Sequence, residues 1–224
     1  MTADAELMPI PLWHGTSSWF VPGILEHGLG AVDVHAQLRS RAFFQAAWEL
    51  RLQIAPPEEQ QKLREGYGFQ ARAIIDDAVT PGGFNYRYGS VYCFGMTGRA
   101  VHFAARGYGS ELVRLGAAWL DEIKTISPDA AASILADYPE MAACLAEDHK
   151  PIVVRLDGIE RRHVRLDDGD EVPPLPGDYL DGFAFELVTP PDRTTVTVFR
   201  VENVRMGFAT AEDYSLVPIQ GTGP

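Results

Sequence analysis

The chain changes character at Pro151. Beyond this residue, the stretches "PIVVRLD", "FAFELV" and "TTVTVFRVENV" are enriched in β-branched and aromatic residues, as is typical of strands. Before it, the chain reads mostly as helices, with two short apolar strands predicted over residues 10–13 and 91–94. This order of a strand, helices, a strand, helices and then several strands differs from the regular alternation of a parallel sheet. It predicts an α+β protein.

With 224 residues and 46% hydrophobic content, the chain is long enough to form one sizeable core. Asp33 is expected to cap a helix that runs to about Ile54. The helix that begins at Pro57 is expected to be interrupted at Gly66-Tyr67-Gly68. We expect a flexible N-terminal tail over residues 1–9, a single domain over 10–208 with a helical insertion over 33–80, and a C-terminal tail over 209–224.

Charge and composition limit the classes of partner. The net charge of −12 disfavours non-specific binding to a nucleic-acid backbone, although a nucleic-acid substrate stays open. The two cysteines, Cys93 and Cys144, are too few for a disulfide framework or a thiolate zinc site. The sequence shows neither a signal peptide nor a membrane span. We therefore expect a cytoplasmic protein without a membrane partner, and delivery into another cell stays open.

His14, Gly15 and Thr16 follow the first predicted strand. Because Gly15 has no side chain, its backbone N–H and C=O could approach a flat amide closely and complement its donor and acceptor. His14 could donate a hydrogen bond to a ribose hydroxyl, and Thr16 could brace the loop. The alternative is an ordinary turn that contains a satisfied histidine.

Two further residues extend this pattern. Tyr92 lies in "SVYCFG", and Glu186 lies in "FAFELVTPP" after a long acidic loop over residues 167–182. In this order, His14, Tyr92 and Glu186 resemble the ADP-ribosyltransferase superfamily, specifically the branch with His, Tyr and Glu on three strands. The poly-ADP-ribose polymerase and diphtheria-toxin-like catalytic domains belong to this branch. The resemblance implies a split β-sandwich of two antiparallel sheets flanked by helices.

The resemblance also implies that NAD binds as a substrate. No metal is expected, because His27, His35 and His102 have no partner at metal-ligand spacing. Tyr92 and, eleven residues later, Phe103 would stack on the nicotinamide ring. Ala100 stands where the polymerases have a serine that binds the carboxamide. Ordinary packing of both aromatic rings in the core is the alternative. The remaining NAD contacts are assigned to His14, Gly15 and Thr16.

Glu186 is the candidate catalytic carboxylate, with His14 and Tyr92 as the other catalytic residues. By bonding the 2-hydroxyl of the ribose, a carboxylate would stabilise the oxocarbenium-like transition state in which nicotinamide leaves. A glutamate that faces solvent from an edge strand is the alternative, and Glu202 on the next predicted strand is the reserve carboxylate. Three arginines near Tyr92 could neutralise the pyrophosphate: Arg87, Arg99 and Arg106.

The function implied is that of an NAD-dependent mono-ADP-ribosyltransferase of toxin or stress-response type. Such an enzyme transfers ADP-ribose to a macromolecule and releases nicotinamide. Three alternatives stay open: a non-catalytic NAD or ADP-ribose binding module, an NAD glycohydrolase on the same fold, and an unrelated α+β domain. An antitoxin or immunity protein that neutralises the chain is a further partner left open.

The acceptor could be a protein or a nucleic acid. Family members that modify arginine usually carry a glutamate two positions before the catalytic one, where this chain has Ala184. The arginine acceptor therefore loses support. The acidic loop over 167–182 would suit a basic protein surface, and Asp181 or Tyr179 could supply the missing acceptor contact.

Overall fold

The computed structural model describes residues 6–77 and 90–219 and confirms the α+β class. The chain divides into two compact units, each built from segments that alternate along the sequence. The first unit is formed by Met1–Val32, Ser90–Gly109 and Asp148–Pro224, and the second by Asp33–Gly89 and Ser110–Glu147. The first unit carries the sheet, whereas the described part of the second is helical. The expected position Arg87 falls outside the described residues.

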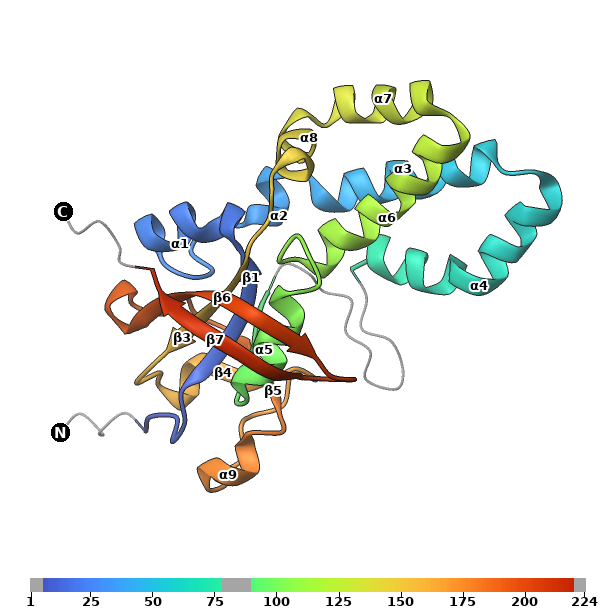
Figure 1. The fold of residues 1–224 in the computed structure, drawn as a ribbon. Coiled ribbons are helices and arrows are strands. Elements are labelled where there is room, and N and C mark those ends of the chain that lie inside the picture. The colour runs from blue at the N-terminus through green and yellow to red at the C-terminus, as the bar shows by residue number, and fades with distance from the viewer. Residues whose placement is uncertain (1–5, 78–89, 220–224) are drawn as a thin grey trace. The chain divides into compact units, whose positions relative to one another are not determined.

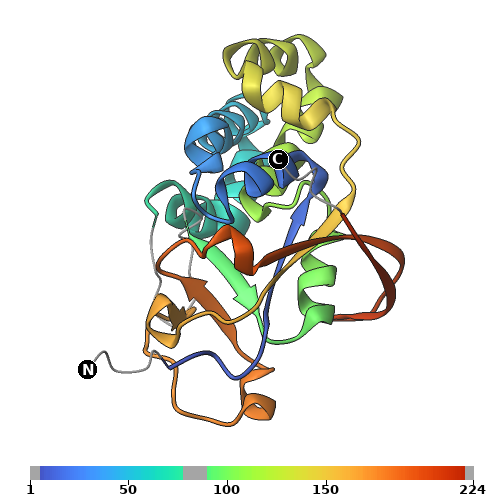
Figure 2. The same cartoon turned by 90° about the vertical axis from the view of Figure 1, so that its left-hand side faces the viewer.

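Seven strands form one sheet in the order β4-β5-β2-β1-β3-β6-β7, antiparallel at each pairing (Figures 1 and 2). Central strand β1 pairs along its whole length with β3, but with β2 only at Trp13 and Phe94. The junction between β1 and β2 is therefore the least paired in the sheet. The strands are β1 (Leu12–Ser17), β2 (Val91–Phe94), β3 (Pro151–Leu156), β4 (Val164–Leu166), β5 (Ala184–Leu187), β6 (Val196–Met206) and β7 (Ala211–Pro218).

Several boundaries in this unit differ from the sequence prediction. Strand β1 extends to Ser17 instead of ending at Trp13, because all six of its residues pair with β3. Strand β7 occupies residues that we expected to be a C-terminal tail. At the other end of the chain, Leu7 bridges Glu160, and Met8 is buried, so residues 7 and 8 do not belong to a loose tail.

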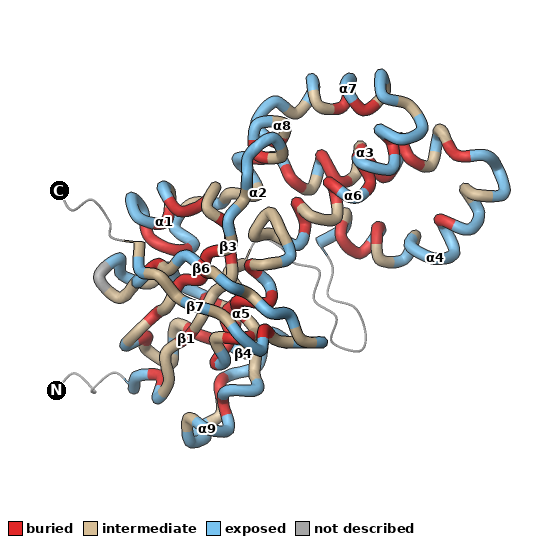
Figure 3. Tube along the Cα trace, viewed as in Figure 1, coloured by how far each residue is buried: buried red, intermediate tan, exposed pale blue. Residues whose placement is uncertain are grey.

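Helix α5 (Thr97–Ala104) packs on one face of the sheet, and one cluster of buried residues lies between them (Figure 3). Helix α1 (Val21–His27) ends at Gly28, and this glycine has a φ of 97°. The cluster beneath α5 consists of Phe94, Ala100, Val101, Ala104, Val153, Val201 and Ala211. The remaining helical elements are η1 (Ser18–Phe20), η2 (Arg161–His163), α9 (Gly177–Leu180) and η3 (Arg193–Thr195).

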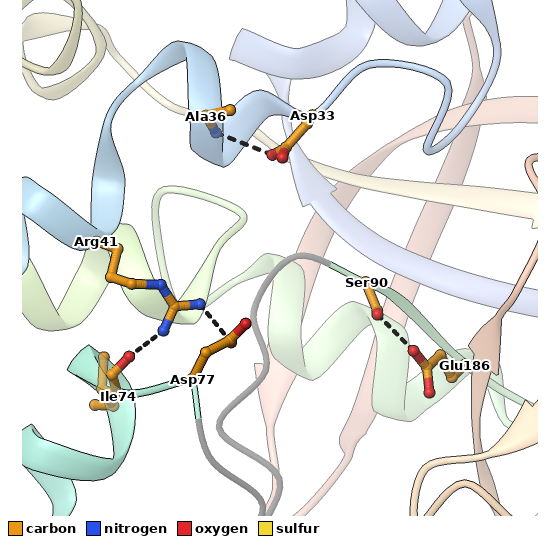
Figure 4. A network of polar contacts seen from close by, with 7 residues as sticks. All are labelled: Asp33, Ala36, Arg41, Ile74, Asp77, Ser90 and Glu186. Atoms are coloured by element: carbon orange, nitrogen blue, oxygen red, sulfur yellow. Dashed lines mark hydrogen bonds and ion pairs between the residues drawn. The ribbon is translucent and has the colours of Figure 1, made fainter.

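In the second unit, helix α3 (Ser40–Ile54) packs against α6 (Glu111–Ile126) and α4 (Pro57–Ile75). Asp33 caps α2 (Val34–Gln37) by accepting a hydrogen bond from the backbone N–H of Ala36 at 2.9 Å (Figure 4). The expected single helix over residues 33–54 is wrong, because the chain turns at Arg39, which has a φ of 50°. The unit is completed by α7 (Pro128–Asp137) and α8 (Pro139–Ala146).

Helix α4 runs without a break through the two glycines at which we expected an interruption. Its C-terminal end is tied to α3, because Arg41 donates hydrogen bonds to the carbonyl of Ile74 and to Asp77 (Figure 4). Near its start, the buried Arg51 of α3 forms an ion pair with Glu59. Contacts with α3 therefore maintain a helix that local propensity disfavours.

Replacing Gly66 with alanine should raise the free energy of unfolding by about 0.5–1 kcal/mol, because glycine inside a helix is disfavoured by chain entropy. A Cβ atom at Gly66 would meet nothing within 4 Å. The measurement is urea unfolding followed by circular dichroism. At Gly116 of α6, a Cβ atom would lie 2.9 Å from the ring of Phe43, so Gly116→Ala should destabilise the protein. Destabilisation by Gly66→Ala would contradict a continuous α4.

Among residues 6–77 and 90–219, none of the helices combines the length and the apolar character needed to cross a membrane.

Candidate active site

The three residues of the predicted triad lie on three neighbouring strands of the sheet. His14 belongs to β1, Tyr92 to β2 and Glu186 to β5, and β2 lies between the other two (Figure 2). Tyr92 and Glu186 are directly opposite each other in the pairing of β2 with β5. Directly opposed residues direct their side chains to the same face of a sheet. Both are half-buried, so this face brings together an aromatic ring and a carboxylate.

His14 connects β1 to β2 through its side chain. Its Nδ1 lies 2.8 Å from the carbonyl oxygen of Tyr92. Continuing the register from Trp13 and Phe94 would place Gly15 opposite Tyr92, but the described pairing ends there. The imidazole bonds to the Tyr92 carbonyl where the ladder stops. This contact joins His14 to the backbone of Tyr92. Because the register gives Gly15 the face of Tyr92, alternation directs the His14 side chain to the other face.

The protonation of His14 follows from this contact. A carbonyl oxygen only accepts, so Nδ1 carries the hydrogen. Burial lowers the pKa of His14, and the hydrogen bond to the Tyr92 carbonyl opposes this effect only in part. The ring is therefore neutral near pH 7, with a lone pair on Nε2. We expected His14 to donate to a ribose hydroxyl, whereas this geometry makes Nε2 an acceptor.

Glu186 is held by a serine that the sequence analysis did not select. The hydroxyl of Ser90 donates a hydrogen bond to Oε1 of Glu186 at 2.5 Å (Figure 4). The two residues that flank the glutamate, Phe185 and Leu187, are buried on the opposite face of β5. Alternation along the strand therefore leaves Glu186 on the half-buried face rather than in the core.

Strand β4 adds a second residue that the sequence analysis missed. Arg165 lies directly opposite Glu186 in the pairing of β4 with β5. Its side chain is exposed and belongs to the same face. The face thus presents Arg165, Glu186 and Tyr92 in a row across three strands. A cation beside the carboxylate suits a substrate that carries phosphate groups.

Gly15 serves the packing of α5 on β1. A Cβ atom at Gly15 would lie 2.1 Å from the carbonyl oxygen of Ala100 and 3.0 Å from the backbone nitrogen of Ala104. The side chains of Ala100 and Thr16 are buried, at 0% and 2% exposure. We expected these residues to contact NAD, but the structure places Ala100 and Thr16 in the interior.

Phe103 lies on α5 with 43% of its surface exposed. Its ring stacks on Phe94, with centroids 5.1 Å apart and planes 25° apart. Phe94 follows Tyr92 by two residues on β2, so the two side chains belong to the same face of the strand. The stack therefore places an exposed aromatic ring beside the strand that carries Tyr92.

The remaining candidates divide between this site and other parts of the unit. Arg99 donates to the carbonyl of Gly182 at 2.7 Å and lies 5.0 Å above the Phe94 ring, while Arg106 is exposed. Glu202 pairs with Arg200 on β6, which β2, β1 and β3 separate from β5. The reserve carboxylate therefore does not join Glu186.

Backbone contacts hold the end of the acidic loop, just before β5. Gly95 follows β2, and a Cβ atom there would lie 2.7 Å from the Cα of Asp181. The next residue, Gly182, is held by the hydrogen bond that its carbonyl oxygen accepts from Arg99. The side chains of Asp181 and Tyr179 are exposed, at 69% for Tyr179. The end of the loop is thus fixed by backbone contacts, while these side chains face outward.

Cys93 lies beside Tyr92 on the opposite face of β2, fully buried, and burial raises the pKa of its thiol. Within the described ranges, no cluster of three or more His, Cys, Asp or Glu side chains is arranged to hold a metal ion. Comparisons with family models, curated proteins and solved structures give no match for this chain.

Proposed function

We propose that this protein is an NAD-dependent mono-ADP-ribosyltransferase of the His-Tyr-Glu branch. The observation that carries the proposal is the direct pairing of Tyr92 with Glu186, together with the bond from His14 to the Tyr92 carbonyl. These three residues are far apart in the sequence and adjacent in the sheet. Tyr92 and Glu186 supply a ring and a carboxylate on one face, and His14 is linked to them through the backbone carbonyl of Tyr92.

The reaction breaks the bond between the ribose carbon and the nicotinamide nitrogen of NAD. Nicotinamide leaves with the electron pair, and positive charge develops on the ribose. Glu186 would accept a hydrogen bond from the neighbouring ribose hydroxyl and stabilise this charge. Nε2 of His14 would accept from another hydroxyl, and Tyr92 would stack on the nicotinamide. The acceptor then bonds to the ribose carbon and loses its proton.

The single pair between β1 and β2 also supports the split β-sandwich. It leaves β4, β5 and β2 as one well-paired group and β1, β3, β6 and β7 as another. We propose that the nicotinamide portion of NAD binds where these two groups part. The rings of Phe103 on α5 and Tyr92 on β2 would then contact the nicotinamide, and Arg165 would bind a phosphate group of NAD.

The test is to incubate the protein with NAD and measure nicotinamide by liquid chromatography and mass spectrometry. The proposal predicts nicotinamide release together with ADP-ribose bound to a protein or nucleic acid from an added lysate. Release with only free ADP-ribose would indicate a glycohydrolase. NAD binding without turnover, even with lysate, would indicate a binding module. Failure to bind NAD in isothermal titration would overturn the proposal.

Replacing Tyr92 with alanine should weaken NAD binding about fivefold to 150-fold, because stacking on an aromatic side chain contributes about 1–3 kcal/mol. Isothermal titration measures the affinity. The matched control is Phe208→Ala, which removes a fully exposed ring and should leave the affinity unchanged. Equal affinity in Tyr92→Ala and the unaltered protein would exclude a stacking role for Tyr92.

A further inference from the structure

We propose that Ser90 is a positioning residue that orients the Glu186 carboxylate for the departure of nicotinamide. This inference rests on the proposed function, because it concerns how the same carboxylate acts. The observation is the hydrogen bond from the Ser90 hydroxyl to Oε1 of Glu186, which links β5 to the residue that precedes β2 (Figure 4).

The register of the two strands explains the contact. Val91 lies opposite Leu187, and Tyr92 lies opposite Glu186. Ser90 is therefore diagonal to Glu186, and alternation along the strand directs both to the face that carries Tyr92. Diagonal neighbours are far enough apart that a long side chain must lean along the strand to reach a short one. The Glu186 side chain thus leans toward Ser90.

This contact has a chemical consequence for the carboxylate. An ionised carboxylate only accepts hydrogen bonds, and a hydroxyl that donates to it holds one oxygen in place. With Oε1 bound to Ser90, the plane of the carboxylate is fixed relative to Tyr92 on the neighbouring strand. A carboxylate that acts on a transition state must be oriented before the charge develops.

A purely structural role for Ser90 predicts a different outcome. A serine at the start of a strand can stabilise the local backbone structure. Its loss would then lower both the stability of the protein and its affinity for the substrate. A positioning role instead affects the transition state more than the bound substrate, so kcat falls while KM is retained. The two roles can be separated by steady-state kinetics.

The experiment compares Ser90→Ala and Ser90→Thr with the unaltered protein in nicotinamide release from NAD. In Ser90→Ala, kcat should fall about tenfold to a hundredfold with KM nearly unchanged. Threonine keeps the hydroxyl and suits a strand, so Ser90→Thr should restore most of kcat. In a background of Glu186→Gln, the further change Ser90→Ala should have little additional effect, because both act through one carboxylate.

Unchanged kcat in Ser90→Ala, or full additivity of the two substitutions, would overturn the inference. The inference would also be overturned if kcat fell in both Ser90→Ala and Ser90→Thr and KM rose in both. Failure of the proposed function is a separate result, because the unaltered protein would then release no nicotinamide. The coupling of Ser90→Ala with Glu186→Ala, which removes the acceptor, in urea unfolding then decides whether the bond itself exists, and additive effects would contradict it.

Discussion

Replacing Glu186 with glutamine should lower nicotinamide release from NAD by about a hundredfold to a thousandfold or more, while NAD affinity changes little. The amide has nearly the shape of the carboxylate, and its oxygen can still accept from Ser90. It lacks the negative charge that stabilises the ribose cation, which develops only as nicotinamide leaves. Initial rates of release and isothermal titration, made on the same preparation, separate the two effects.

Glu202→Gln is the matched control for this prediction. Glu202 is also a glutamate on a strand of the sheet. It lies on β6, where it forms an ion pair with Arg200, and is separated by three strands from Glu186 on β5. Its substitution should leave nicotinamide release unchanged. Loss of NAD binding in Glu186→Gln equal to the loss of turnover would show that the glutamate serves the structure rather than the transition state.

The same pair of variants tests the toxin interpretation. If transfer of ADP-ribose harms the cell, expression of the unaltered chain should slow bacterial growth, and Glu186→Gln should relieve this effect. Glu202→Gln should remain as harmful as the unaltered chain. Equal growth of all three strains at equal protein levels would contradict a toxic activity in that host.

The parts of the fold that could be predicted are those with a strong local pattern. Strand β2 and the strand over 151–156 are short apolar runs, and Ser127 with Pro128 marks the start of α7. Strands β4 and β7 were missed because they lie at the two edges of the sheet. An edge strand is held by backbone pairing to one neighbour, so its side chains need no regular pattern.

The break between α2 and α3 shows a second limit. No glycine or proline marks it, because the residue with left-handed backbone geometry is Arg39. Its guanidinium donates to the carbonyl of Asp137 at 3.2 Å and lies 4.6 Å above the ring of Tyr138. These contacts come from a segment about a hundred residues away, so local propensity contains no signal for this turn.

The candidate site also contains residues that the sequence could indicate and residues that it could not. The order of His14, Tyr92 and Glu186 along the chain was sufficient to select them. Ser90 and Arg165 could not be selected, because their proximity to Glu186 depends on the register of three strands. A shift of one residue in the pairing of β2 with β5 would move Ser90 to the face opposite Glu186, and a shift in the pairing of β4 with β5 would do the same to Arg165.

Gly15 illustrates the remaining ambiguity, because a sequence does not distinguish a glycine that admits a ligand from one that admits a helix. Replacing it with alanine should lower the free energy of unfolding by about 3 kcal/mol, the upper range for overpacking a core. The added Cβ atom would lie 2.1 Å from the carbonyl oxygen of Ala100, a backbone atom that cannot rotate away. Urea unfolding measures the loss.

Gly23→Ala is the control for this last substitution, because a Cβ atom at Gly23 in α1 would meet nothing within 4 Å. It should leave stability unchanged or slightly raised. Since Phe103 belongs to α5, any displacement of that helix by Gly15→Ala should also weaken NAD binding beyond what instability explains. Full stability and full NAD affinity in Gly15→Ala would show that α5 does not press on β1 at this residue. The nicotinamide site proposed between β1, β2 and α5 would then have to lie elsewhere.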